Sequence, residues 1–217
     1  MRRYSPISPE RVPDELAEFL VAVDIPGRAL RVALDGPRAA GPDELAGALT
    51  EPLRTRSRPA IHVRAQAFWR DASLRLEHGR HDVESYQDWL DAAALRREVL
   101  GPLGPNGSGE YVPSLRDPET NRATRDPRRT APYGSVVIVS GELLLGRGLP
   151  FDVTIHLAVG ATARTRRTTP DWAWTLPAFD AYDRDVDPVG TADVVVRLDD
   201  PRHPAIAFTS DRRANRQ

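Results

Sequence analysis

The sequence predicts a single α/β domain in which a mostly parallel central sheet is flanked by helices. Two observations support this fold class. Short β-prone runs alternate with helical patterns along the chain, and the runs at 136–139 and 151–157 are of the kind found in strands covered on both faces. With 217 residues, of which 40% are hydrophobic, the chain is long enough for one compact domain with a sizeable core and short for two.

The first half of the chain begins with residues 1–12, which are expected to form a flexible arm ahead of a domain at 13–210. A helix is expected from Pro13, because a proline followed by two acidic residues is typical of a first helical turn. The other expected elements of this half are a strand at 30–34, a helix at 42–53, a strand at 60–64 and helical segments to about residue 100.

The second half opens with residues 101–134, which are rich in proline, glycine and arginine and are expected to form an irregular excursion or a small hairpin. After the two strands named above, a lid-like region at 163–185 begins with an arginine-bearing helix. A last strand is expected at 192–196, and the polar tail at 211–217 is expected to be frayed.

Composition excludes several classes of function. The chain has 30 basic and 31 acidic residues and a net charge of -1, so it carries no overall field that would attract nucleic acid or an anionic membrane. No apolar run approaches the roughly 20 residues that cross a bilayer, and the chain starts with polar sequence, so we expect a cytoplasmic protein. Cysteine is absent and each of the 30 basic residues is an arginine, which excludes disulfides, thiol chemistry and any lysine-dependent step.

The turn between the first strand and the next helix has the outline of a phosphate-binding loop. Gly36 and Gly41 are separated by four residues, as in loops whose N–H groups, lysine and Ser/Thr hold phosphates and magnesium. The positions of the lysine and the hydroxyl residue hold Pro42 and Asp43, which removes a donor and adds a negative charge. Such a helix start satisfies its own positive end, so we expect the loop to need no phosphate. Arg38 is the cation within the loop that could replace the lysine.

The order of the later segments resembles the uridine kinase-like branch of the nucleoside and nucleotide kinases, over residues 13–205. The matching pieces are Leu34–Asp35–Gly36, Phe68–Trp69–Arg70 with Arg75, Gly79 and Tyr86, Gly101–Pro102–Leu103, Val136 to Gly141–Glu142–Leu143, Arg164 with Arg167, and Asp187–Pro188 with Asp193. The resemblance implies a three-layer P-loop kinase-like fold with a nucleoside-binding cleft.

The sequence departs from this family where phosphoryl-transfer chemistry resides. Gln66 and Ala67 stand where the family's acidic pair supplies the base, and Ser140 stands where an aspartate steers magnesium. Because the phosphate-binding loop is also altered, three separate parts of the machinery are changed, and we expect no ATP, no metal and no other cofactor. His78 and His81 have a three-residue spacing, but no third metal ligand accompanies them.

Ligands of open parallel sheets bind beyond the carboxyl ends of the strands, where the former nucleoside cleft is expected to remain. Asp35 and Glu142 are the two carboxylates there that could act as a general acid or base. The Trp172-x-Trp174 pair in the lid-like region favours an apolar or cyclic small molecule as the ligand, with core packing as the alternative. The residues expected to contact the ligand are Gln66, Phe68, Trp69, Arg70, Arg75, Tyr86, Ser140, Arg164, Arg167 and Trp172.

Three functions are compatible with these features. The first is a repurposed kinase-fold protein of specialised metabolism that binds a small molecule without ATP, or converts it by cyclisation, isomerisation or elimination, and it predicts an open apolar cavity lined by Trp69 or Trp172. The second is a non-catalytic pseudokinase that binds a partner protein, and it predicts a collapsed cleft and an exposed apolar patch. The third is an atypical nucleoside kinase that relies on Arg38. Neither the oligomeric state nor the identity of a ligand follows from the sequence.

Overall fold

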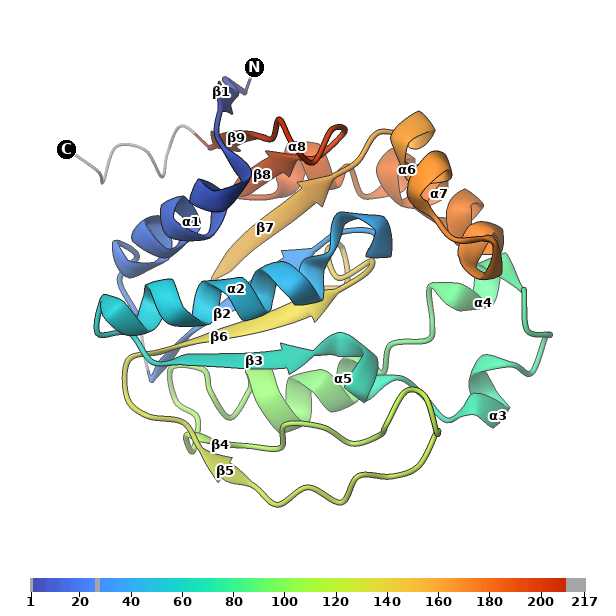
Figure 1. The fold of residues 1–217 in the computed structure, drawn as a ribbon. Helices are drawn as coiled ribbons and strands as arrows, with labels where there is room; N and C mark the ends of the chain where they lie inside the picture. Colours follow the sequence, from blue (N-terminus) through green and yellow to red (C-terminus); the bar gives the residue numbers. More distant parts are fainter. Residues whose placement is uncertain (1, 26–27, 210–217) are drawn as a thin grey trace.

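One seven-stranded sheet forms the centre of the fold in the residues that the computed structural model describes, 2–25 and 28–209 (Figure 1). Five of its strands, in the order β8-β7-β2-β6-β3, are parallel. Their bounds are β2 (Ala29–Asp35), β3 (Ala60–Arg64), β6 (Ser135–Gly141), β7 (Val153–Ala158) and β8 (Val194–Arg197). The mostly parallel α/β fold that the sequence predicts is confirmed.

Two short antiparallel strands complete the sheet beyond β8. β9 (Ala205–Phe208) runs antiparallel to β8, and β1 (Ser5–Pro6) pairs with β9. Part of the segment predicted to be a flexible arm therefore forms an edge strand, which is followed by the 3₁₀ helix η1 (Pro9–Arg11). Two residues are too few to show the alternation of a strand, and their pairing partner lies at the other end of the chain, so no local pattern marks them.

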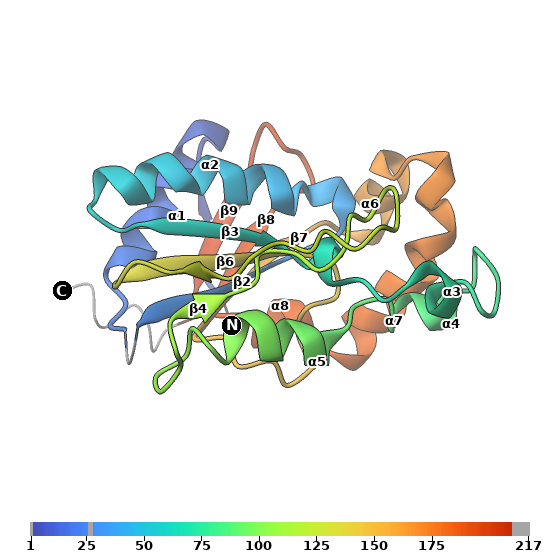
Figure 2. The ribbon, with the colours of Figure 1, turned by 90° about the horizontal axis from the view of Figure 1, so that it is seen from below.

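Two long helices, α1 (Val12–Val21) and α2 (Pro42–Thr55), cover one face of the sheet (Figures 1 and 2). Leucines four residues apart line the inner side of each helix, because this spacing places side chains on one helix face. They are Leu16 and Leu20 of α1 and Leu49 and Leu53 of α2, and they belong to one buried cluster with Leu30, Val32 and Leu34 of β2.

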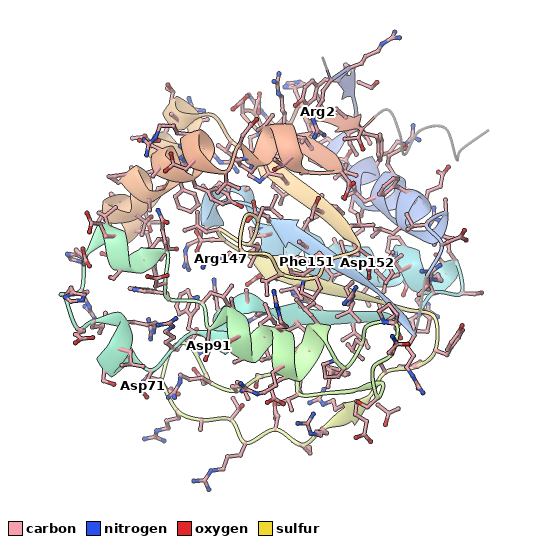
Figure 3. All side chains as sticks on the ribbon, turned by 180° about the vertical axis from the view of Figure 1, so that it is seen from behind. Arg2, Asp71, Asp91, Arg147, Phe151 and Asp152 are labelled. Atoms are coloured by element: carbon pink, nitrogen blue, oxygen red, sulfur yellow. The ribbon has the colours of Figure 1, made fainter. Side chains whose placement is uncertain are left out.

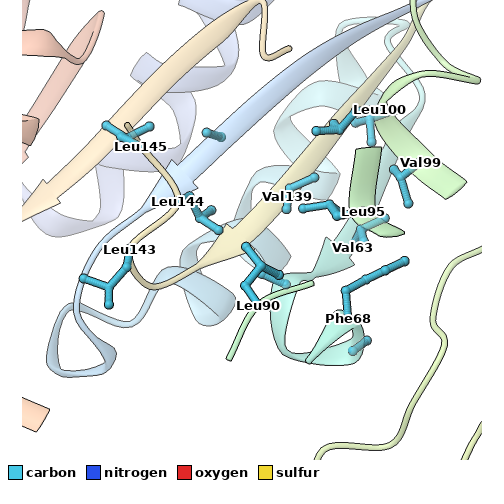
Figure 4. Packing of buried hydrophobic residues seen from close by; sticks show 14 of the residues in the cluster. Val63, Phe68, Leu90, Leu95, Val99, Leu100, Val139, Leu143, Leu144 and Leu145 are labelled. Atoms are coloured by element: carbon cyan, nitrogen blue, oxygen red, sulfur yellow. The ribbon is translucent and has the colours of Figure 1, made fainter. Parts of the chain in front are cut away.

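The opposite face is covered by α5 (Ala92–Leu95), which continues as the π-helical segment η4 (Arg96–Leu100), and by α7 (Leu176–Asp185) and α8 (Pro188–Thr191) (Figure 2). Val63 of β3, Val139 of β6 and Leu95 of α5 meet in this second cluster (Figure 4). Every residue of β2 and β6 is buried, which explains why residues 136–139 are apolar without alternation.

Short elements connect these layers at the carboxyl ends of the strands. They are η2 (Arg38–Ala40), η3 (Ala65–Phe68), α3 (Ala72–Arg75), α4 (Val83–Tyr86), α6 (Ala161–Arg167) and η5 (Pro170–Thr175). Within 101–134, β4 (Glu110–Tyr111) and β5 (Arg129–Thr130) form a separate antiparallel pair. The tail predicted to be frayed, 211–217, lies outside the described residues. Within 2–25 and 28–209, no helix is long and apolar enough to cross a membrane.

Candidate functional site

The loop that joins β2 to α2 is closely packed at both of its glycines. A Cβ atom at Gly36 would lie 2.8 Å from Cβ of Leu157, so only glycine lets the loop pass against the end of β7. Gly41 adopts the left-handed conformation (φ 69°, ψ 51°) and is the N-cap of α2, with Pro42 as the first helical residue. The helix start that the sequence predicts is present, and its first turn carries Asp43 and Glu44.

The backbone N–H groups of this loop are engaged by acceptors within the protein. The N–H of Ala40 donates to the carbonyl of Pro37 (2.7 Å), and the N–H of Gly41 donates to the carbonyl of Arg38 (3.1 Å). The N–H of Gly36 donates to the carbonyl of Gly141 at the end of β6 (3.1 Å). A loop that cradles phosphate instead directs its N–H groups at the ligand. In this structure the N–H groups of Gly36, Ala40 and Gly41 are therefore bonded within the chain.

Glu142 supplies an anion to this loop from within the chain. Its Oε1 accepts the backbone N–H of Arg38 at 2.8 Å, and its Oε2 accepts the guanidinium of the same residue at 3.1 Å. The hydroxyl of Tyr86 also donates to Oε2, at 2.8 Å. The carboxylate side chain is only 7% exposed. Burial, together with the charge of Glu142, raises the pKa of Tyr86 well above its ordinary value, so this hydroxyl remains a donor.

The side chain of Asp43 points to the ends of the neighbouring strands. Its carboxylate accepts the hydroxyl of Ser140, and Nε2 of His62 lies 2.7 Å from the same hydroxyl oxygen. Because the only hydroxyl proton is given to Asp43, the histidine donates from Nε2. Burial lowers the pKa of His62 below its ordinary value. Asp43 and Ser140, the two positions at which the sequence resemblance implies magnesium-binding residues, are thus bonded to each other.

Asp35 lies in the interior, with no exposed surface. Its carboxylate accepts the N–H of Leu144 (2.8 Å) and the hydroxyl of Tyr182 (3.1 Å), and it lies 2.6 Å from Nδ1 of His156. A general acid or base must reach the ligand's proton directly or through one water. The predicted acid–base role of Asp35 is therefore not supported, and its contacts tie the segment after β6 and the helix α7 to the end of β2.

Beyond the carboxyl ends of β3 and β6, a small cavity of about 20 Å³ marks the centre of the predicted cleft. Its lining includes Gln66, Trp69, Tyr86, Trp89, Glu142 and Arg147. A cavity of this volume holds about one water molecule. Four of the residues predicted from the sequence therefore meet here: Gln66, Trp69, Tyr86 and Glu142. Phe68, which is 1% exposed, belongs to the hydrophobic core instead.

Aromatic rings fill the space in which a lid would close over the cleft. Trp172 and Trp174 of η5 stack on each other with centroids 6.3 Å apart, and the rings of Tyr86 and Trp89 pack against both. The guanidinium of Arg38 lies 3.8 Å from the ring centroid of Trp172. The guanidinium of Arg38 therefore lies between the Trp172 indole and the Glu142 carboxylate, and the aromatic rings close the cleft. The open apolar cavity that the small-molecule hypothesis predicts is not found here: Trp69 borders a space of only about 20 Å³, and Trp172 packs against other rings.

Two of the predicted ligand-binding arginines hold helix α6 in place. Arg164 is 3% exposed and pairs with Asp180 (2.7 Å) and Asp183 (2.9 Å) of α7. Arg167 donates to the carbonyl of Leu198 (2.6 Å) and to a carbonyl of the loop after β2. The terminal nitrogens of Arg164 and Arg167 thus bond acceptors within the chain, which gives both arginines a structural role, although the buried Nε of Arg164 has no partner.

Arg147 is a site residue that the sequence did not single out. Its guanidinium donates to the carbonyls of Leu143 (2.5 Å) and Gln87, which joins the segment after β6 to the segment after α4. Burial lowers the pKa of Arg147 below its ordinary value. Arg147 also borders a groove of about 250 Å³ along residues 144–151, near Phe151, and a groove of about 340 Å³ between Leu149 and residues 92–97 (Figure 3). The sequence feature that could have indicated Arg147 as a site residue is its position a few residues after Glu142, in the segment that follows the same strand.

Arg70 and Arg75 do not face the small cavity at Glu142. They line a second cavity of about 560 Å³ between α3 and α4, at the edge of the molecule marked by Asp71 in Figure 3. Trp89 contributes to both cavities. The residues predicted to contact a ligand therefore lie partly at the small cavity beside Glu142 and partly at the cavity between α3 and α4. No group of three or more His, Cys, Asp or Glu residues within the described ranges is arranged to hold a metal ion.

The comparisons with known proteins identify the fold. No family model and no curated protein matches the sequence. Among solved structures, a possible uridine kinase from Bacillus stearothermophilus superposes with a TM-score of 0.69 at 20% identity, over 84% of this chain and 96% of that one. A putative fructose transport system kinase from Silicibacter sp. TM1040 gives 0.58 at 20% identity, over 83% and 95%. The YGR205w protein gives 0.59 at 9% identity, over 94% and 100%. The P-loop kinase-like fold implied by the sequence resemblance is confirmed.

Proposed function

We propose that this chain is a kinase-fold protein that transfers no phosphate from ATP and binds a small cyclic molecule at the carboxyl ends of its strands. The observation that carries this proposal is that the Glu142 carboxylate accepts hydrogen bonds from both the backbone N–H and the guanidinium of Arg38. An incoming phosphate would have to displace this buried carboxylate from two charge-assisted contacts and would then meet the carboxylate itself.

The residues at the start of α2 also disfavour the binding of a phosphate. Pro42 provides no N–H at the start of α2, and Asp43 and Glu44 place two negative charges in its first turn. The chain contains no lysine that could approach the phosphates. A triphosphate would therefore lose donors at the loop and gain repulsion at the helix start, and no part of the loop compensates for both effects.

The chemistry of the ligand follows from what Arg38 now contacts. A planar cation lies over Trp172 and is bonded to Glu142, with Tyr86 as a further hydrogen-bonding neighbour. A flat ring that carries an N–H or a positive charge could take the same place, with the ring on the indole and the donor on the carboxylate. Binding then requires that Arg38 swings away, because the present cavity holds about one water.

Glu142 is the group that could carry out chemistry on such a ligand. It borders the cavity, whereas Asp35 does not reach it. A single carboxylate in a site walled by aromatic rings supports proton transfer, which would serve cyclisation, isomerisation or elimination.

Phosphoryl transfer is the second candidate, because two of the similar structures are named as a possible and a putative kinase. It requires that MgATP displaces Glu142 from Arg38. A pseudokinase that binds a partner protein is the third candidate. The small cavity favours it, but Leu74 and Tyr133 are the only large hydrophobic side chains of the described ranges that are exposed, and two side chains make no extensive patch.

Tryptophan fluorescence and thermal unfolding test these alternatives together, since all four tryptophans of the chain lie at the cleft. MgATP, MgGTP and uridine should leave the unfolding temperature of the wild-type protein unchanged, although a site filled at about 100 times its Kd would add about 2.7 kcal/mol. Cyclic amines and heterocycles should quench the fluorescence, and Glu142→Gln should abolish this effect. Glu51→Gln, at an exposed ion pair on α2, is the matched control.

Stabilisation by MgATP, or transfer of its phosphate, would overturn the proposal in favour of a kinase. A pyrophosphate-binding gain in Glu142→Ala would support the view that this carboxylate blocks the loop. If no cyclic compound quenches the wild-type fluorescence, the pseudokinase alternative replaces the small-molecule function.

A further inference from the structure

A buried arginine with open donors lies between helices α3 and α4. Arg75 is 8% exposed, and its guanidinium carbon lies 5.0 Å from the ring centroid of Trp69 and 4.7 Å from that of Trp89. Nε donates to the carbonyl of Arg70 at 2.9 Å. Among the described residues, no acceptor bonds either terminal nitrogen of Arg75. The two indole rings hold the guanidinium in a fixed orientation, while its outer edge is left for a ligand.

The cavity that Arg75 lines has the size and the charge pattern of a ligand site. Its volume of about 560 Å³ falls within the range of about 300–1,000 Å³ that small-molecule sites occupy. A second cation, Arg70, also lines the cavity, together with four carboxylates: the exposed Glu77, Glu84 and Asp88 and the half-buried Asp82, which accepts the N–H of Ser85. His78 and Ser85 complete its polar lining. The side chain of Leu74, which is 58% exposed, adds an apolar contact.

We propose that the cavity between α3 and α4 binds a small zwitterion of the amino-acid class. The ligand's carboxylate bonds the outer edge of the Arg75 guanidinium as a two-point contact, with Arg70 as a neighbouring charge. Its ammonium group faces Glu77 and Glu84, and its side chain contacts Leu74. This site is independent of the small-molecule function proposed for the cleft, because the two cavities share only Trp89 among their lining residues.

Simpler ligands fit this charge pattern less well. An inorganic anion would satisfy Arg75, but the four carboxylates that line the cavity would repel it. A simple cation would be attracted by the carboxylates but repelled by Arg70 and Arg75. A zwitterion whose ammonium and carboxylate groups are attached to the same carbon atom can contact the arginines and the carboxylates at the same time.

Isothermal titration of the full chain with each of the twenty standard amino acids tests the proposal. At least one, with leucine as the first probe, should bind, and its N-acetyl and amide derivatives should bind at least about tenfold more weakly, since each lacks one of the two charges. Arg70→Gln and Glu84→Gln alter exposed side chains and should each weaken binding, while Glu10→Gln, at an exposed position of η1, should not. Arg75→Gln should abolish binding, with its fold checked by circular dichroism.

Three results would overturn the proposal. The first is no binding of any of the twenty amino acids at millimolar concentrations. The second is acetate or inorganic phosphate binding as tightly as the amino acid, which would make the cavity a simple anion site. The third is unchanged affinity in both Arg70→Gln and Glu84→Gln. Fluorescence quenching by cyclic compounds in the cleft is a separate readout, so failure of one site does not imply failure of the other.

Discussion

Replacing Asp35 by alanine should lower the free energy of unfolding by about 4 kcal/mol, since each buried donor left without its acceptor costs about 1–3 kcal/mol. Three donors face this carboxylate: the N–H of Leu144, the hydroxyl of Tyr182 and the ring nitrogen of His156. Asp35 has no exposed surface, so water cannot readily replace it as the acceptor. A domain with a total stability of about 5–15 kcal/mol would lose a large fraction of it.

Asparagine at the same position should cost less, about 1–2 kcal/mol, because its amide retains one acceptor of similar shape. That oxygen can still bind the N–H of Leu144, and the ring of His156 can accept from the amide by changing its tautomer. The hydroxyl of Tyr182 then lacks an acceptor. Urea unfolding followed by tryptophan fluorescence measures both variants, with Glu51→Gln at an exposed ion pair as the control that should change stability by less than about 0.5 kcal/mol.

A loss of less than about 1 kcal/mol in Asp35→Ala would refute this reasoning, because it would mean that the three donors find other acceptors. The relative stability of the two variants is a second test. An asparagine variant as unstable as the alanine variant would show that the negative charge of Asp35, rather than the number of its acceptor atoms, stabilises this hydrogen-bond network. A catalytic carboxylate would behave differently, with activity lost in both variants and stability nearly retained.

Three further predictions concern the elements around the cleft. Gly36→Ala should destabilise the protein by about 1–3 kcal/mol, since its Cβ would lie 2.8 Å from Cβ of Leu157, and the urea midpoint measures this. Arg164→Ala should cost about 1–3 kcal/mol through its two lost ion pairs and lost packing, and hydrogen exchange should show faster opening of α6. The burial-lowered pKa of His62 means that the unfolded chain binds a proton that the folded protein does not, so stability should fall as the pH drops below about 6.5. His62→Gln should reduce this fall in urea titrations at acidic and neutral pH, and an unchanged pH profile would contradict the assignment.

The elements that depend on local pattern could be predicted from the sequence. Residues 60–64 match β3 at both ends, and the strand at 30–34 lies within β2, because runs of β-prone residues bounded by turns are visible without knowledge of partners. The apolar strand at 136–139 was recognisable because a parallel strand is buried on both faces. The prediction of an altered phosphate-binding loop also came from local sequence, since Pro42 and Asp43 stand where the resemblance expects a lysine and a hydroxyl residue.

Contacts between distant segments required the tertiary structure. Glu142 and Arg38 are 104 residues apart, and nothing local shows that a carboxylate at the end of β6 takes the donors of the loop after β2. The same applies to Asp35, which has the sequence position of a catalytic group but is covered by Tyr182 of α7. Burial and hydrogen-bond partners are properties of packing, so a residue list drawn from strand ends contains both cleft residues and core residues.

The sequence by itself determined that the chain is an α/β protein of kinase-like order without lysine or cysteine, and it predicted an altered phosphate-binding loop, because these are properties of composition and spacing. Only the tertiary structure decided which polar groups are free to meet a ligand. It closed the cleft with Glu142, Arg38 and aromatic rings, and it placed Arg75 in a separate cavity with its outer donors open. The physical reason is that a charged side chain is available for binding only when the fold leaves it without a partner, and that partner comes from elsewhere in the chain.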